Sequence, residues 1–158
     1  MINIAVNGVC GRMGLRIATL VAEDKDLKLV AALEMKGHQH IGKDLSSIIS
    51  RGHNDVIISE ELDDSADVLI DFTSPDSTMD RLQACADKDI AIVTGTTGLD
   101  SEQMKQIKKA SQTIPCLFSP NMSVGVNLLF NLVESVSKIL GDEADIEIIE
   151  SHHRYKKD

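Results

Sequence analysis

Short apolar runs alternate along the chain with longer segments in which apolar residues recur every three or four positions. The short runs are rich in Val, Ile, Leu and Ala, and they predict β-strands at 3–6, 27–33, 56–58, 68–71, 91–94, 115–118 and 146–149. The longer segments predict helices, most clearly at 12–23, 76–87, 101–111 and 126–140. Several of them begin with Ser, Asp or Asn, which favour the capping position of a helix.

Strands separated by helices predict a parallel sheet that carries helices on both of its faces. The runs at 68–70 (VLI) and 91–93 (AIV) are apolar at every position, which is typical of strands buried on both faces. We therefore expect an α/β protein with a doubly wound parallel sheet. The sequence contains no internal repeat and no low-complexity segment.

Composition narrows the class of protein further. The 158 residues are enough for one full domain, and an aromatic content of 3% implies a core of Val, Ile, Leu and Ala. No apolar run approaches the roughly 20 residues of a membrane span, and no targeting segment is evident. The chain has three cysteines, Cys10, Cys85 and Cys116, which is an odd number. They lie far apart in the sequence, and none forms a CxxC pair. Neither a disulfide framework nor a zinc knuckle is expected, and a cytoplasmic location fits.

A net charge of −9 argues against nucleic acid as a partner, because phosphate binding needs clustered Lys and Arg. The only dense basic group is the terminal SHHRYKKD, 151–158. Composition alone favours a mobile, solvated end for such a run. The alternative is that it forms part of an anion-binding site.

Three glycines mark the loop after the first predicted strand. In NGVCGRMG, Gly8, Gly11 and Gly14 lie between that strand and the first predicted helix, the context of the dinucleotide fingerprint of Rossmann-like domains. There the first glycine allows a sharp turn, the second allows backbone N–H groups to approach a pyrophosphate, and the third allows close helix packing. The spacing is GxxGxxG rather than GxGxxG, so a purely structural turn is the alternative.

Glu34 strengthens the nucleotide interpretation. It closes the second strand 20 residues after Gly14, where an acidic side chain can accept hydrogen bonds from the adenine ribose hydroxyls. Lys36, two residues later, could reach a 2′-phosphate. The competing interpretation of Glu34 is a solvated strand end.

Three further loops follow predicted strands. DFTSP (71–75), TGTTG (94–98) and SPNMSVGVN (119–127) each supply small polar residues at the strand ends that face the ligand crevice of an open α/β sheet. Gly95 and Thr96 offer small side chains and backbone groups to a nicotinamide or its ribose. Each loop alone could be a plain strand-to-helix turn.

The ordered set NGVCGRMG, AALE, DFTSP, GTTG, SPNMSVGVN and IEIIESHHRYKKD resembles the dihydrodipicolinate reductases, which reduce 4-hydroxy-tetrahydrodipicolinate to tetrahydrodipicolinate in the diaminopimelate route of lysine biosynthesis. The resemblance covers the whole chain, and its last motif is the most specific. Family members continue with a Pro-Ser-Gly-Thr segment and a second domain of mixed sheet. The sequence is therefore similar to the N-terminal portion of such an enzyme.

The resemblance implies a dinucleotide-binding domain at 1–123 and, at 124–158, the first helix and strand of a substrate-binding α+β domain whose remainder is absent. It implies NADH or NADPH as cofactor, a small dicarboxylate substrate, no membrane partner, and a homotetramer for the full-length protein. The cofactor contacts carried over are Gly8, Val9, Cys10, Gly11, Arg12, Met13, Glu34, Gly95, Thr96, Thr97, Ser119, Pro120, Asn121 and Met122. Met35 stands where relatives often have a basic residue, which leaves the choice between NADH and NADPH open.

Carried over in the same way, His152 and Lys156 are catalytic and His153 contacts the substrate. Reduction of a cyclic imine needs a hydride and a proton, and His is a common proton donor near neutrality. Lys156 could protonate a leaving hydroxyl or hold a carboxylate. The 158 residues alone are expected to bind cofactor with little turnover, and a disordered end is expected for this chain.

Other patterns are weaker. His38 and His40 lie in a Gly-bounded loop, but no Cys or further His is near in sequence, so we expect a surface loop and no metal site. Ser, His and Asp occur without a GxSxG elbow, so a hydrolase triad has little support. A regulatory domain that senses NAD(P)H without catalysis is the alternative function, and it would have no need for the terminal HHxxK.

Overall fold

The computed structural model describes residues 1–49, 55–151 and 154, apart from the side chain of residue 142. By its internal contacts the chain divides into two compact units, 1–119 and 120–158. The described part contains no helix long and apolar enough to cross a membrane.

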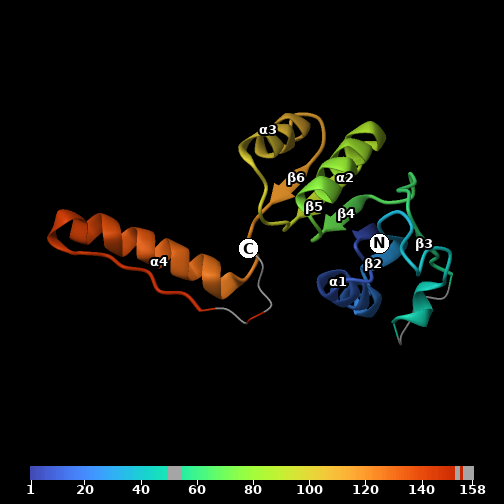
Figure 1. Ribbon diagram of the computed structural model, residues 1–158, viewed down its shortest axis with the longest axis horizontal. Helices are drawn as coiled ribbons and strands as arrows, with labels where there is room; N and C mark the ends of the chain where they lie inside the picture. Colours follow the sequence, from blue (N-terminus) through green and yellow to red (C-terminus); the bar gives the residue numbers. More distant parts are fainter. Residues whose placement is uncertain (50–54, 152–153, 155–158) are drawn as a thin grey trace. The chain divides into compact units, whose positions relative to one another are not determined.

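The first unit is built on a six-stranded parallel sheet in the order β3-β2-β1-β4-β5-β6 (Figure 1). The strands are β1 (Ile2–Asn7), β2 (Leu27–Leu33), β3 (Ile58–Ser59), β4 (Val68–Asp71), β5 (Ala91–Thr94) and β6 (Cys116–Phe118). The connecting helices are α1 (Arg12–Glu23), α2 (Pro75–Lys88) and α3 (Ser101–Ala110), with a short 3-10 turn at Leu45–Ser47. The strand order reverses beside β1, and such a switch point opens a crevice at the carboxyl ends of the strands.

Each face of this sheet has its own apolar core. Ile4 and Val6 of β1 pack on the face covered by α1, together with Ala18 and Val21. Ala5, between them, points to the opposite face, because successive strand residues alternate. There Leu69 and Ile92 meet residues of α2 and α3, including Leu82, Cys85 and Ile107. The predicted doubly wound sheet is confirmed, and its aliphatic core explains the low aromatic content.

Local sequence accounts for where the helices begin and end. The Asp100 side chain accepts hydrogen bonds from the backbone N–H groups of Glu102 and Gln103. The side-chain oxygen of Gln103 in turn accepts one from the backbone N–H of Asp100, which completes a capping box for α3. Pro75 opens α2, where its missing N–H costs nothing. These starts place the loops before α2 and α3 at the carboxyl edge of the sheet.

Two predicted strands differ from the structure by more than one residue at an end. The third was expected at 56–58 but lies at Ile58–Ser59, because the preceding residues pair elsewhere: Ile57 forms an antiparallel bridge with Asp44, and the carbonyl of Val56 accepts from the N–H of Leu45. No strand forms at 146–149, which is described. A strand needs a hydrogen-bonded neighbour, and the described residues of the second unit provide none.

The second unit consists of α4 (Val124–Leu140), a 3-10 turn (Gly141–Glu143) and an extended segment. Ser123 caps α4 through the N–H of Val126. None of its side chains is buried, although the helix is rich in apolar residues. Leu129, Phe130 and Leu132 are more than half exposed, and Ile149 beyond the turn is 93% exposed. The described structure therefore leaves the apolar residues of α4 uncovered.

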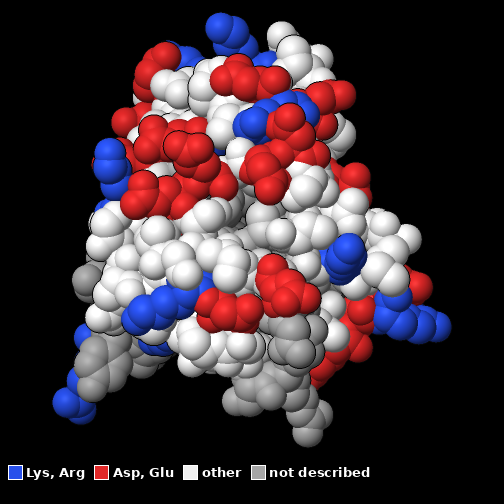
Figure 2. Space-filling model, turned by 90° about the vertical axis from the view of Figure 1, so that its right-hand side faces the viewer, with Lys and Arg blue, Asp and Glu red and all other residues white. Residues whose placement is uncertain are grey.

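Charge is unevenly distributed over the surface. On the face shown in Figure 2, Asp and Glu side chains gather in clusters, with Lys and Arg scattered among them. A net charge of −9 produces a negative field around the molecule. An anionic ligand therefore depends on local donors, which the loops at the carboxyl edge can supply.

Candidate functional site

A cleft of about 160 Å³ opens at the carboxyl ends of β1, β2 and β4. It is lined by Asn7, Gly8, Glu34, Met35, Thr73, Ser74 and Ser77. These residues come from the glycine loop, the end of β2 and the start of α2, all of which follow parallel strands. The cleft thus lies at the switch point where open α/β sheets bind their ligands. Larger hollows lie elsewhere, between α2 and α3 and beside the start of β2.

The glycine loop leaves β1 and is held against the end of the neighbouring strand, β2. The N–H groups of Gly8 and Val9 both donate to the carbonyl of Leu33, at 2.9 and 3.1 Å, and Gly11 donates to the carbonyl of Gly8. Gly8 has a φ of +68°, a conformation that L side chains rarely adopt. A Cβ on Gly14 would lie 2.1 Å from the Gly8 carbonyl oxygen. Gly8 therefore makes the turn, and Gly14 lets α1 lie against it.

Gly11 has a different role from its neighbours. It caps α1 with φ −75° and ψ 164°, which any residue can adopt, and a Cβ there would meet only the Gly8 carbonyl oxygen, at 3.1 Å. The backbone does not require glycine at this position. Beyond it, Arg12 and Met13 are exposed, and the first-turn N–H groups of α1 have no acceptor within the helix. The loop can therefore offer an anion a helix N-terminus without a side chain in the way.

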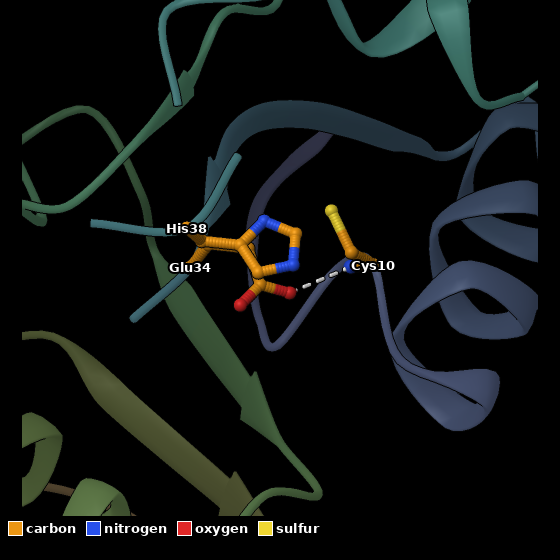
Figure 3. A group of neighbouring side chains, drawn as sticks. All are labelled: Cys10, Glu34 and His38. Atoms are coloured by element: carbon orange, nitrogen blue, oxygen red, sulfur yellow. Dashed lines mark hydrogen bonds between the residues drawn. The ribbon is translucent and has the colours of Figure 1, made fainter. Parts of the chain in front are cut away.

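Glu34 connects the glycine loop to the end of β2. The residue is only 7% exposed. One carboxylate oxygen accepts from the backbone N–H of Cys10 at 2.8 Å (Figure 3). The other accepts from the backbone N–H of Met35 at 3.1 Å. A carboxylate has about four lone-pair sites, so two bonds leave capacity for the hydroxyls of a ligand in the cleft. Glu34 is thus not the solvated strand end that was its alternative.

The same carboxylate acts on the thiol of Cys10. Burial, together with the negative charge of Glu34 and a hydrogen bond to it, raises the pKa of Cys10 to about 11. The thiol is therefore protonated at neutral pH. In the absence of a ligand, Cys10 presents a neutral S–H group beside the loop.

A buried carboxylate joins four elements below the cleft. Asp71, at the end of β4, is fully buried. Asn7 of β1 and Thr73 donate to one of its oxygens, each at 2.7 Å. The hydroxyls of Thr78, Thr94 and Thr96 surround the other oxygen at 2.5, 3.3 and 3.2 Å. Sequence reasoning placed Asp71 at this edge but missed the network, whose only signal was the density of Thr residues after two neighbouring strands.

Arg81 holds this network from the side. Its Nε donates to the side-chain oxygen of Asn7 at 3.1 Å, and a terminal nitrogen donates to the carbonyl of Glu60 at 2.8 Å. Because Arg81 occupies the oxygen of Asn7, the amide nitrogen must face Asp71. The hydrogen bonds at the floor of the cleft therefore run in one direction only: Arg81 donates to Asn7, and Asn7 donates to Asp71.

The remaining predicted contacts in the first unit are divided between the interior and the surface. The side chain of Val9 is fully buried in the core on the α1 face. The Thr96 hydroxyl is turned toward Asp71, and its residue is 2% exposed. A Cβ on Gly95 would lie 2.0 Å from the Phe72 ring, so glycine is needed there for packing. Thr97 is exposed and Ser119 is half-buried.

The other predicted contacts belong to the second unit. Asn121 accepts through its side chain from the N–H of Ser123, and its carbonyl accepts from Asn127, so it shapes the start of α4. Pro120 and Met122 are exposed. His152, His153 and Lys156 lie outside the described residues. Arg154 is exposed.

Together the sheet order, the glycine loop and the acidic end of β2 define a nucleotide-binding α/β domain of the Rossmann type. The chain matches the family model "Dihydrodipicolinate reductase, N-terminus" over residues 2–122 and "Dihydrodipicolinate reductase, C-terminus" over 125–158. It belongs to the dihydrodipicolinate reductase family.

Relatives named 4-hydroxy-tetrahydrodipicolinate reductase match the entire chain. That of Syntrophotalea carbinolica is 45% identical and that of Geobacter metallireducens is 44% identical, and the chain spans 60% of the length of each. Among solved structures, a dipicolinate-bound dihydrodipicolinate reductase from Paenisporosarcina sp. TG-14 is 25% identical with a TM-score of 0.66, over 87% of this chain and 54% of that one. An aspartate semialdehyde dehydrogenase with NADP from Candida albicans is 14% identical with a TM-score of 0.54, over 75% of this chain and 43% of that one. At this identity the likeness shows the fold alone.

Proposed function

We propose that this chain is the cofactor-binding part of a reductase that converts 4-hydroxy-tetrahydrodipicolinate to tetrahydrodipicolinate with NADH or NADPH, in lysine biosynthesis. The chain spans 60% of relatives that bear this enzyme's name. The observation that carries the proposal is the buried carboxylate of Glu34, held against the glycine loop at the switch point of the sheet. A plain structural turn has no need for an acidic side chain there.

The residues at the cleft fit a nicotinamide dinucleotide. Gly14 allows close packing of α1, whose first-turn N–H groups suit a pyrophosphate, and Gly11 leaves that approach open. Glu34 has spare lone pairs for the ribose hydroxyls. When bound, such a cofactor supplies hydride. The chain itself supplies the donors that hold the pyrophosphate, the acceptor that orients the ribose, and the Asp71 network that fixes the floor.

Cofactor choice follows from the residues after Glu34. A carboxylate favours a free 2′-hydroxyl, whereas the exposed Lys36 offers positive charge to a 2′-phosphate. Met35, between them, is 71% exposed and contributes no charge. We expect less than about tenfold discrimination between NADH and NADPH, which corresponds to about 1.4 kcal/mol.

Catalysis is assigned to the terminal motif. His152 would donate the proton, Lys156 would protonate a leaving group or hold a carboxylate, and His153 would contact a dicarboxylate substrate. Such a substrate needs donors in a fixed frame, since a misplacement of about 1 Å can cost a hundredfold in rate. We therefore expect this chain to bind cofactor with negligible turnover. Cytoplasmic location and a homotetramer of the longer protein belong to the same proposal.

Fluorescence titration with NADH tests the cofactor site. The parent chain should bind saturably, and Gly11→Val should lose binding because its side chain fills the pyrophosphate approach. Gly11→Ser is the control, since serine suits a helix cap and is small. Equally tight binding by Gly11→Val would show that the pyrophosphate lies elsewhere.

A coupled assay that generates the unstable substrate in place tests the catalytic assignment. The longer protein should oxidise NADH in the presence of substrate, and His152→Ala or Lys156→Ala should remove most of that turnover. The 158-residue chain should show almost none. Robust turnover by the chain alone would contradict the need for a further part of the pocket.

A further inference from the structure

Three metal-binding side chains of different chemistry meet beside the glycine loop. Cys10, Glu34 and His38 each offer one ligand atom, and these atoms all lie within 4.8 Å of one another. They come from the loop after β1, the residue after β2 and the loop that follows it. Figure 3 shows the imidazole of His38 directed across the Glu34 carboxylate toward Cys10. Sequence analysis expected no metal here because Cys10 is 28 residues before His38.

This cluster differs from the acidic groups that are common on protein surfaces. Glu34 is buried, and Cys10 and His38 are both partly buried. The His38 ring is held in place by His40, whose ring stacks on it with centroids 5.5 Å apart and whose backbone N–H lies 3.4 Å from Nδ1. A metal ion would therefore meet ligands that are already gathered, rather than mobile surface side chains.

The donor set selects the kind of ion. One sulfur, one nitrogen and one carboxylate oxygen suit Zn²⁺, whereas Mg²⁺ and Ca²⁺ prefer oxygen ligands alone. Ligand atoms on one tetrahedral zinc lie about 3.3–3.7 Å apart, as follows from bonds of about 2.0–2.3 Å. Side-chain rotations that move the ligand atoms by about 1 Å would close the present cluster to that size. Three protein ligands leave the fourth position to water.

We propose that Cys10, Glu34 and His38 form a Zn²⁺ site whose occupation excludes the nicotinamide cofactor. On binding, the S–H bond of Cys10 breaks, a sulfur–zinc bond forms, and the proton passes to solvent. The ion binds the carboxylate of Glu34, which the proposed function assigns to the ribose. It lies between that carboxylate and the glycine loop. The exclusion rests on the proposed function, whereas the metal site itself does not.

The metal site is tested without cofactor. Co²⁺, which replaces zinc in such sites and absorbs light, should bind one per chain and show a thiolate-to-cobalt charge-transfer band. Cys10→Ser should abolish the band, and the control Cys116→Ser should keep it, because Cys116 lies on β6. His38→Gln should weaken Zn²⁺ binding at least tenfold in calorimetry. No thiolate band, or a band that survives Cys10→Ser, overturns the site.

Competition tests the exclusion. At free Zn²⁺ ten times its own Kd, the apparent Kd for NADH should rise about elevenfold, as mutual exclusion requires. His38→Gln should bind NADH normally and show no such rise. An NADH affinity unchanged by saturating Zn²⁺ overturns the exclusion. If NADH fails to bind even without zinc, the exclusion falls with the proposed function, while the cobalt spectrum still decides the metal site.

Discussion

Single residues at the cleft hold one another in place, and Glu34 is the centre of this arrangement. Its carboxylate binds the loop through the N–H of Cys10 and also disfavours the thiolate of the same residue. One side chain therefore sets both the shape of the glycine loop and the chemical state of its cysteine.

Neutralising Glu34 should make Cys10 more reactive. Glu34→Gln removes the negative charge but keeps an oxygen that can accept from the Cys10 N–H, so the pKa of Cys10 should fall from about 11. The thiolate is the nucleophile, so iodoacetamide should label Cys10 faster at pH 8, as measured by peptide mass spectrometry. Cys85, whose pKa burial raises to about 12, is the internal control. Equal labelling rates in both proteins would show that Glu34 does not govern this thiol.

Gly14 should be far less replaceable than Gly11. A Cβ at Gly14 overlaps backbone atoms of Gly8 and Val9 that cannot rotate away. Gly14→Ala should lower the free energy of unfolding by about 1–3 kcal/mol, despite a gain in helix propensity of up to about 1 kcal/mol. Gly11→Ser, with ordinary φ and a good capping side chain, should stay within about 0.5 kcal/mol of the parent. Urea unfolding measures both, and a fully stable Gly14→Ala would mean that the loop can move away from α1.

At the scale of elements, Asp71 ties β1, β4, β5 and α2 together at the end where the cleft opens. Its two oxygens receive five polar groups from segments up to 64 residues away. A hydrogen-bonded carboxylate at this depth fixes the relative position of these elements more specifically than apolar contact does.

Asp71→Asn should destabilise the fold by about 1–3 kcal/mol, because its NH₂ group must face a donor. Arg81 prevents Asn7 from reversing its amide, so the new NH₂ group should face the threonine hydroxyls, which then lose the oxygen to which they donate. Thermal unfolding measures the loss. Asp80→Asn is the matched control and should have little effect, because Asp80 is exposed on α2. Equal stability of the two variants would contradict a structural role for Asp71.

Elements set by local patterns were predicted closely from the sequence. The bounds of β2, β4, β5 and α1 agree with the prediction because apolar periodicity and turn residues are local signals. The strand near 57 was misplaced because its register depends on the distant segment around Asp44. The Asp71 network and the meeting of Cys10 with His38 were missed for the same reason, since both arise only when the sheet brings separate loops together.

Considered as a whole molecule, the chain leaves much apolar surface uncovered in its second unit. Leu132, Val136 and Leu140 border a shallow apolar groove of about 260 Å³ on α4 that also includes Ile146. A contiguous apolar surface of this kind is typical of a contact region.

The chain should self-associate in solution through α4. Light scattering over a range of concentrations should show species larger than a monomer, and Leu132→Lys with Val136→Lys should shift the chain toward monomer because charge opposes burial of the face. Leu20→Lys is the control, since Leu20 is an exposed apolar residue of α1, outside this groove. A monomer at every concentration in the parent chain would contradict this expectation.

The central position of β1 in the sheet affects how the protein folds while the ribosome makes it. β1 is made before β2 and β4, yet its residue Ile4 pairs with Val68 as well as with Leu29. During synthesis the unit of β1, α1 and β2 can assemble early. The edge of β1 that faces away from β2 stays unpaired until β4 has left the exit tunnel. An unpaired strand edge invites association with other chains. Nascent chains of this protein therefore pass through an interval in which a chaperone that covers this edge would raise the yield of folded product.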